Sequence, residues 1–133
     1  MIVLSNSAAQ TLIPGQAVTF DTVTLHTGNA ECHRKGSSSV KFRCNGLYEV
    51  SFSGNITNSE AGAVQLTIAV DGTALSDGTM ISTPAAVGDV NNVAKTTLVS
   101  NCCGGGDAIT VVNNGTANVI VEPGSTLYIA RKA

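Results

Sequence analysis

The side chains best suited to metal binding or redox chemistry in this sequence are four thiols and two imidazoles. They belong to Cys32, Cys44, Cys102, Cys103, His26 and His33. Structural zinc sites usually draw two ligands from one C-x(2–4)-C turn, but here the first two cysteines are separated by eleven residues and the last two are adjacent. Adjacent thiols also make a poor redox pair, because a bridge between neighbours strains the peptide that joins them. We therefore expect neither a metal site nor a cofactor.

A disulfide is the alternative use of the first cysteine pair. The stretch CHRKGSSSVKFRC predicts a hairpin with its turn at residues 36–39, and a bridge from Cys32 to Cys44 would cross its strands. Free thiols are favoured, because four cysteines in 133 residues do not form the dense framework of a disulfide-rich secreted domain.

No local motif predicts catalysis. The glycine run at 104–106 lacks the Lys-Ser/Thr that ends a phosphate-binding loop, and no serine stands in a G-x-S-x-G elbow. The nine acidic residues are scattered, and Asp71, Asp77 and Asp89 suit turn positions better than calcium ligands. We therefore expect no catalytic residue and no enzymatic activity.

Basic residues concentrate in the predicted hairpin. Four of the seven in the chain lie there: Arg34, Lys35, Lys41 and Arg43. A solvated hairpin accounts for such a cluster. The functional alternative is contact with an anionic partner, either an acidic capsid surface or an anionic polymer of a cell surface.

The overall composition indicates a protein that assembles. Charged residues make up 12% of the chain and hydrophobic residues 43%, against about 25% charged in a typical soluble domain. A surface this poor in charge predicts that other copies of the chain cover part of it. A net charge of −2 and an aromatic content of 4% argue against general nucleic-acid binding.

The sequence shows neither an export signal nor a membrane span. The opening MIVLSNSAAQ has no basic start and only four consecutive apolar residues, and no apolar run approaches the length of a membrane-spanning helix. We expect synthesis in the cytoplasm and no insertion into a membrane.

Short alternating runs broken by Gly, Asn or Pro predict a single all-β domain over residues 1–133. The expected strands are 17–25, 40–43, 47–57, 64–70, 93–101, 108–112, 119–121 and 126–130, with a short one at 79–82. In GLYEVSFSGNI, alternation places one set of side chains on a buried face and the other set outside. The core is expected to contain Phe20, Tyr48, Val50, Phe52, Ile109 and Ile129.

Five motifs in order along the chain resemble the jelly-roll domain shared by the complement globular head, the tumour necrosis factor ligands and the heads of bacterial collagen-like spore-surface glycoproteins. They are FDTV at 20–23 with Gly28, GLYEVSF at 46–52, DG at 71–72, GDAITV at 106–111 and TLYIAR at 126–131. The second motif looks like the family's G-x-Y-x-F strand and is the most diagnostic.

The resemblance implies a sandwich of two antiparallel sheets with about ten strands, and a homotrimer whose inner sheets pack about a three-fold axis. Residues expected near that axis are Leu98, Cys102, Cys103 and Tyr128. The chain shows no collagen-like stalk and no signal peptide, so bacterial and phage-encoded relatives fit better than complement or cytokine signalling.

We therefore expect a non-enzymatic, trimeric head that decorates or projects from a phage or prophage particle, located on the virion or particle surface. Residues 1–14 would form an N-terminal lead that docks on a capsid or other virion protein. A spore-surface protein is one alternative. Another is a domain that binds a carbohydrate or cell-surface receptor through the loop-rich segment 76–92.

Overall fold

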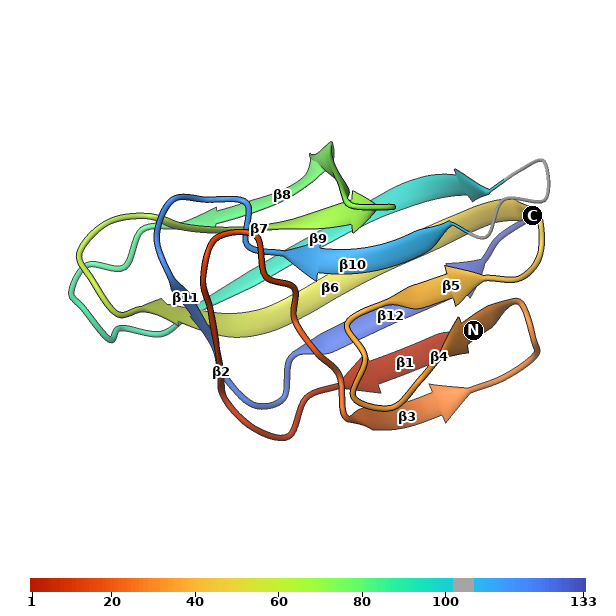
Figure 1. Ribbon diagram of the computed structural model, residues 1–133, viewed down its shortest axis with the longest axis horizontal. Helices are drawn as coiled ribbons and strands as arrows, with labels where there is room; N and C mark the ends of the chain where they lie inside the picture. The colour runs from red at the N-terminus through yellow and green to blue at the C-terminus, as the bar shows by residue number, and fades with distance from the viewer. Residues whose placement is uncertain (102–106) are drawn as a thin grey trace.

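The computed structural model describes residues 1–101 and 107–133, which form twelve β-strands in two antiparallel sheets (Figure 1). The predicted all-β, two-sheet jelly-roll class is confirmed, with twelve strands in place of about ten. The predictions for Cys102 and Cys103 lie outside the described residues. Within the described ranges, no helix has the length and apolarity that a membrane crossing requires.

The larger sheet has seven strands, and we call it the large sheet. Its order is β2 (Gln10–Leu12), β11 (Val119–Val121), β6 (Gly46–Asn58), β12 (Thr126–Arg131), β1 (Ile2–Ser5) and β3 (Thr22–His26), with β9 (Asn91–Asn101) also paired to β6. β11 and β12 pair with different parts of β6 and so share one of its edges, whereas β9 runs along the other edge. The long strand β6 is therefore the axis of this sheet.

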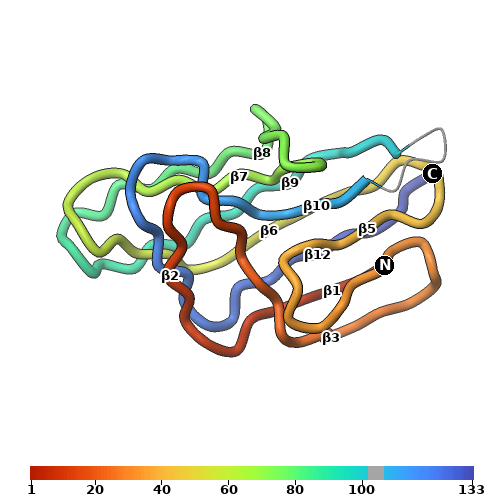
Figure 2. The backbone as a smooth tube through the Cα atoms, in the orientation of Figure 1, coloured from red at the N-terminus to blue at the C-terminus, as the bar shows by residue number. Residues whose placement is uncertain are grey.

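The smaller sheet has five strands, and we call it the small sheet. Its order is β4 (Glu31–His33), β5 (Val40–Phe42), β10 (Ala108–Val112), β7 (Val64–Val70) and β8 (Thr73–Ser82). Figures 1 and 2 show the strands of the two sheets running along the same long axis of the molecule.

One apolar core fills the space between the sheets. The six side chains expected there are fully buried: Phe20, Tyr48, Val50, Phe52, Ile109 and Ile129. The Tyr48 ring stacks on Phe42 with ring centroids 3.9 Å apart, and its hydroxyl donates to the Cys44 carbonyl at 2.7 Å. Burial raises the pKa of Tyr48. At Gly54 the buried face of β6 has no room for a side chain, because a Cβ would lie 2.4 Å from Ser125 Oγ.

Residues 17–21 do not continue the strand that the sequence predicts over 17–25. β3 begins only at Thr22, and before it the chain makes backbone bonds to the small sheet and its β4–β5 turn. The Val18 N–H donates to Val111 O at 2.8 Å, and the Phe20 N–H donates to Ser37 O at 3.1 Å. The alternation in this segment reflects burial of Val18 and Phe20 in the core rather than membership of a regular strand.

The segment 76–92 is less loop-rich than its sequence indicates. β8 extends from Thr73 to Ser82 and β9 starts at Asn91, so the loop covers only 83–90. The first five residues of β8 are exposed or half-buried, and they therefore lack the apolar alternation that identifies a strand.

Residues 1–14 belong to the domain and do not form a separate lead. β1 lies between β12 and β3, β2 pairs with β11, and Ile2, Leu4 and Leu12 are buried in the core. The Met1 ammonium group lies 3.0 Å from the buried carboxylate of Glu31. Contact with a larger particle would have to use the exposed positions 7–9, 11, 13 and 14.

Candidate assembly face and basic turn

The outer face of the large sheet consists of the outward positions of β1, β6, β9 and β12, together with the exposed strand β3. Along β6, the outward residues Leu47, Glu49, Ser51 and Ser53 alternate with the buried ones. Strand register then sets one row across five strands, in the order Leu25, Val3, Tyr128, Ser51 and Thr96. The face is built by pairing between segments from both ends of the chain.

Large apolar side chains are exposed on this face. Leu98 on β9 is 57% exposed, and Leu25 on β3, opposite the outward Val3, is 43% exposed. Val23 on β3 lies opposite the buried Leu4 and so belongs to the other side of the sheet. Leu47 on β6 is 36% exposed, and Tyr128 is half-buried. Leucines exposed on one sheet face are typical of a surface that another chain covers.

The polar groups of the outer face are mostly hydroxyls. The Thr96 hydroxyl donates to Ser51 Oγ at 3.0 Å across β9 and β6. At the outward positions of β1, β6, β9 and β12 the charged residue is Glu49, and its carboxylate lies 3.8 Å from the Lys132 ammonium group. Little charge would therefore have to be desolvated if the face were buried.

Two of the four residues expected at a three-fold axis are placed on this face. Leu98 is opposite Glu49, and Tyr128 is opposite Ser51, so the two side chains lie on neighbouring rows on either side of β6. Cys102 and Cys103 follow β9 directly and lie outside the described residues.

The second candidate site is the turn between β4 and β5, residues 34–37, which we call the basic turn. Its backbone closes through the Ser37 N–H, which donates to Arg34 O at 2.8 Å. Gly36 has a φ of +84°, a conformation that favours glycine. The Gly36 N–H donates to Phe20 O at 2.8 Å, which ties the turn to the crossing segment 17–21.

His33 strengthens this tie from beneath the turn. Its ring nitrogens lie 3.0 Å from Ser39 O and 3.1 Å from Phe20 O. The ring therefore links β4, the residue before β5 and the crossing segment, and so helps to fix the position of the basic turn.

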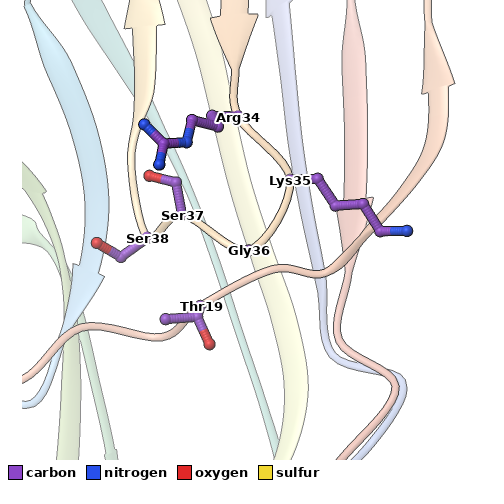
Figure 3. A pocket seen from close by; sticks show the side chains of 6 residues that line it. All are labelled: Thr19, Arg34, Lys35, Gly36, Ser37 and Ser38. Carbon is purple, nitrogen blue, oxygen red and sulfur yellow. The ribbon is translucent and has the colours of Figure 1, made fainter.

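A hollow of about 480 Å³ opens at the basic turn, lined by Thr19, Arg34, Lys35, Gly36, Ser37 and Ser38 (Figure 3). In Figure 3 the Arg34 guanidinium group lies toward Ser37, whereas Lys35 extends to the opposite side of the turn. Lys41 and Arg43 do not line the hollow. Of the four basic residues grouped by sequence, the structure therefore brings two to one site.

The cysteines and histidines that the structure describes do not converge. Cys32 and Cys44 are free thiols, so the alternative of a disulfide between them is wrong. Register explains this, because Cys32 lies opposite Lys41 and Cys44 is three residues further along. The His26 Nε2 atom lies 3.1 Å from the Glu31 carbonyl. Among residues 1–101 and 107–133, no three His, Cys, Asp or Glu side chains are grouped so that they could hold a metal ion.

The three aspartates expected at turns accept hydrogen bonds: Asp71 from the Ala108 N–H at 2.9 Å, Asp89 from the Ala86 N–H at 3.2 Å and Asp77 from the Thr97 hydroxyl at 2.9 Å. Asp77 lies within β8 rather than in a turn. A side-chain hydrogen bond with Asp71 raises the pKa of Asp107, and repulsion between the two charges acts in the same direction. The pair joins the β7–β8 turn, which contains Asp71, to the start of β10, which Asp107 precedes.

The sequence matches no protein-family model and none of the curated proteins. Its structure, however, is similar along nearly the whole chain to solved jelly-roll domains. An Eiger tumour necrosis factor from S. frugiperda has a TM-score of 0.74 and 11% identity, covering 99% of this chain and 91% of that one. The globular domain of zebrafish complement 1qA has a TM-score of 0.70 and 11% identity, covering 98% of each chain.

A viral protein shares the fold as well. The vertex protein P5 of PRD1 has a TM-score of 0.57 and 14% identity, covering 99% of this chain and 96% of that one. The chain thus has the jelly-roll fold of the tumour necrosis factor and complement heads, as the five sequence motifs predicted. At these identities the likeness defines the fold.

Proposed function

We propose that the chain is a non-enzymatic head domain that forms a homotrimer through the outer face of the large sheet and stands on the surface of a phage or prophage particle. The observation that carries the assembly is this uncovered face, where Leu25, Leu47 and Leu98 are exposed and Glu49 is the outward charge. The likeness to tumour necrosis factor and complement heads supports a three-fold arrangement.

The shape of the face suits a closed ring. In a ring each copy presents two different patches, one to each neighbour. The outer face has apolar residues at both of its margins, Leu25 on β3 and Leu98 on β9. Each margin of one copy would meet a different part of the next, and a stable contact would bury roughly 800 Å² on each partner.

Solution mass tests the assembly. We expect the purified chain to have the mass of three copies by light scattering or native mass spectrometry. Leu98→Asp places a charge in the contact and should yield single chains. A single-chain mass for the unchanged protein at micromolar concentration would overturn the trimer.

A matched control separates the assembly face from apolar exposure in general. Val87 lies in the 83–90 loop and is 56% exposed, against 57% for Leu98. Val87→Asp should therefore leave three copies together. If both variants dissociate equally, the outer face is not the contact.

The particle setting is supported by the likeness to the PRD1 vertex protein P5. Attachment would use the exposed residues of the segment 1–14, of which Ile13 is 51% exposed. Peptides of this chain should be found in washed particles released by the host cell, and Ile13→Asp should weaken retention while Val87→Asp does not. Absence from particles, or presence on spores instead, would contradict the phage setting.

A further inference from the structure

The hollow at the basic turn has positive charge that nothing in the described part of the chain neutralises. The ion pairs among the described residues join Met1 to Glu31 and Lys132 to Glu49, and none of these four residues lines the hollow. Neither Arg34 nor Lys35 has an acidic partner within 4.0 Å among those residues. The nearest carboxylate along the crossing segment, Asp21, accepts hydrogen bonds from Ser7 and Thr22, which lower its pKa.

The backbone that carries the hydrogen-bond donors of the hollow is fixed by contacts with the rest of the domain. Two backbone hydrogen bonds join the basic turn to Phe20, and the His33 ring lies against the carbonyl oxygens of Phe20 and Ser39. Arg34 follows this anchored ring directly in the chain. A cation held in this way loses less freedom on binding than one on a free loop.

The side chains that line the hollow suit a tetrahedral oxyanion. The Arg34 guanidinium group presents several N–H donors in a planar fork. Ser37 and Ser38 add hydroxyls on the same side of the turn (Figure 3). The Ser37 hydroxyl is shared with Ser39 at 3.3 Å, whereas Ser38 has no hydrogen-bond partner among the described side chains.

Lys35 indicates a ligand with more than one charge. In Figure 3 its ammonium group and the Arg34 guanidinium group lie on opposite sides of the turn, which favours a ligand with a separate anionic group for each. A polymer with repeated anionic groups could place one group at Arg34 and the next at Lys35. The hydroxyl-rich lining contains no aromatic ring on which a base would stack, which favours a polysaccharide over a nucleic acid.

We propose that the hollow between Thr19 and the basic turn binds a sulfate or phosphate ester group of an anionic polysaccharide. Arg34 with Ser37 and Ser38 holds one ester group, and Lys35 contacts the next group along the polymer. All residues of the site belong to one chain and none is among the outward residues of the large sheet, so we expect the ester to bind with or without trimer formation.

Dextran derivatives test the site on a single polymer backbone. Binding of the full chain to dextran sulfate, dextran phosphate and neutral dextran is measured by calorimetry at low salt. We expect binding to one or both esters and none to neutral dextran, and the stronger ester identifies the anion. No binding to either ester, or equally tight binding of single-stranded DNA, would overturn the proposal.

Paired substitutions separate the site from general charge attraction. Arg34→Ser with Lys35→Ser should weaken ester binding about tenfold or more, since charge-assisted hydrogen bonds are lost. Lys41→Ser with Arg43→Ser removes the same charge outside the hollow and should weaken it by no more than about threefold. Equal losses in the two double variants would mean that no site exists. Melting temperature and solution mass of both variants show that fold and assembly are intact.

Discussion

The outer face of the large sheet and the basic turn are opposite kinds of surface on one small domain. The face is broad, regular and nearly uncharged, with Leu98 and Leu25 exposed on its margins. The turn is narrow and charged, and hydrogen bonds to the crossing segment and to His33 hold it in place. If both proposals hold, the chain separates assembly from recognition: one surface would be buried between copies, and the other would stay available.

The largest expected effect is a difference in unfolding free energy between substitutions on the buried face and on the outer face of the large sheet. Phe52→Ala on the buried face of β6 should lower the free energy of unfolding by about 3–5 kcal/mol, because it leaves a cavity in the core. Leu98→Ala on the outer face should change the stability of the single chain by no more than about 0.5 kcal/mol.

Urea unfolding, followed by circular dichroism, measures both effects. The experiment is done on a Leu25→Asp background, which places a charge at the other margin of the outer face and should also yield single chains, since assembly would otherwise add a concentration-dependent contribution. A loss for Leu98→Ala comparable to that for Phe52→Ala would show that the outer face is part of the fold rather than a surface for other copies.

The next effect tests how firmly the basic turn is held. His33→Ala removes the ring that lies near two carbonyl oxygens and should cost about 1–2 kcal/mol of unfolding free energy. It should also weaken ester binding, although it removes none of the donors that line the hollow. His26→Ala, which loses a contact to one carbonyl, is the control and should cost less. Unchanged ester binding in His33→Ala would mean that the turn needs no such anchor.

The smallest effect concerns Asp21, the carboxylate at the end of the crossing segment. The Ser7 hydroxyl, more than any other group, holds the pKa of Asp21 below its usual value of 3.8. Because the folded pKa is depressed, this interaction adds stability above the unfolded pKa and is lost as the pH falls through the folded value. Ser7→Ala should therefore raise the pKa of Asp21 in a carbon-detected NMR titration, and Arg34→Ser should leave it unchanged. A rise in Arg34→Ser would show that Asp21 neutralises the basic turn.

Much of the fold follows from local pattern. The strands at 64–70, 108–112 and 119–121 are found with the predicted bounds, because their apolar residues alternate or run together between clear turns. β4 was expected only as the first arm of the hairpin, without bounds, and β1 and β2 were not predicted, since each has four residues or fewer and pairs with strands distant in sequence. A short run such as IVLS carries too little alternation to reveal its partner.

The two candidate sites also differ in how far local sequence pattern predicts them. Alternation along β6 was enough to separate Tyr48 and Phe52 from the outward residues of that strand, and hence to define one face of the sheet. The hollow could not be predicted, because it needs Thr19, fifteen residues before Arg34, and a crossing segment that looks like a strand in sequence. Grouping Lys41 and Arg43 with Arg34 followed from proximity in sequence, whereas the hollow contains only the residues at the turn.

The pairing of β1 with β12 has a consequence for how the molecule forms. Ile2 lies opposite Ile129, so strands from the two ends of the chain are neighbours in the middle of the large sheet. Closing such a distant contact is entropically costly and slows folding. During synthesis, β1 can pair early with β3, but its other edge has no partner until β12 has been made. Until then the nascent chain would expose that edge with its apolar residues, and brief protection by a chaperone would favour correct closure over aggregation.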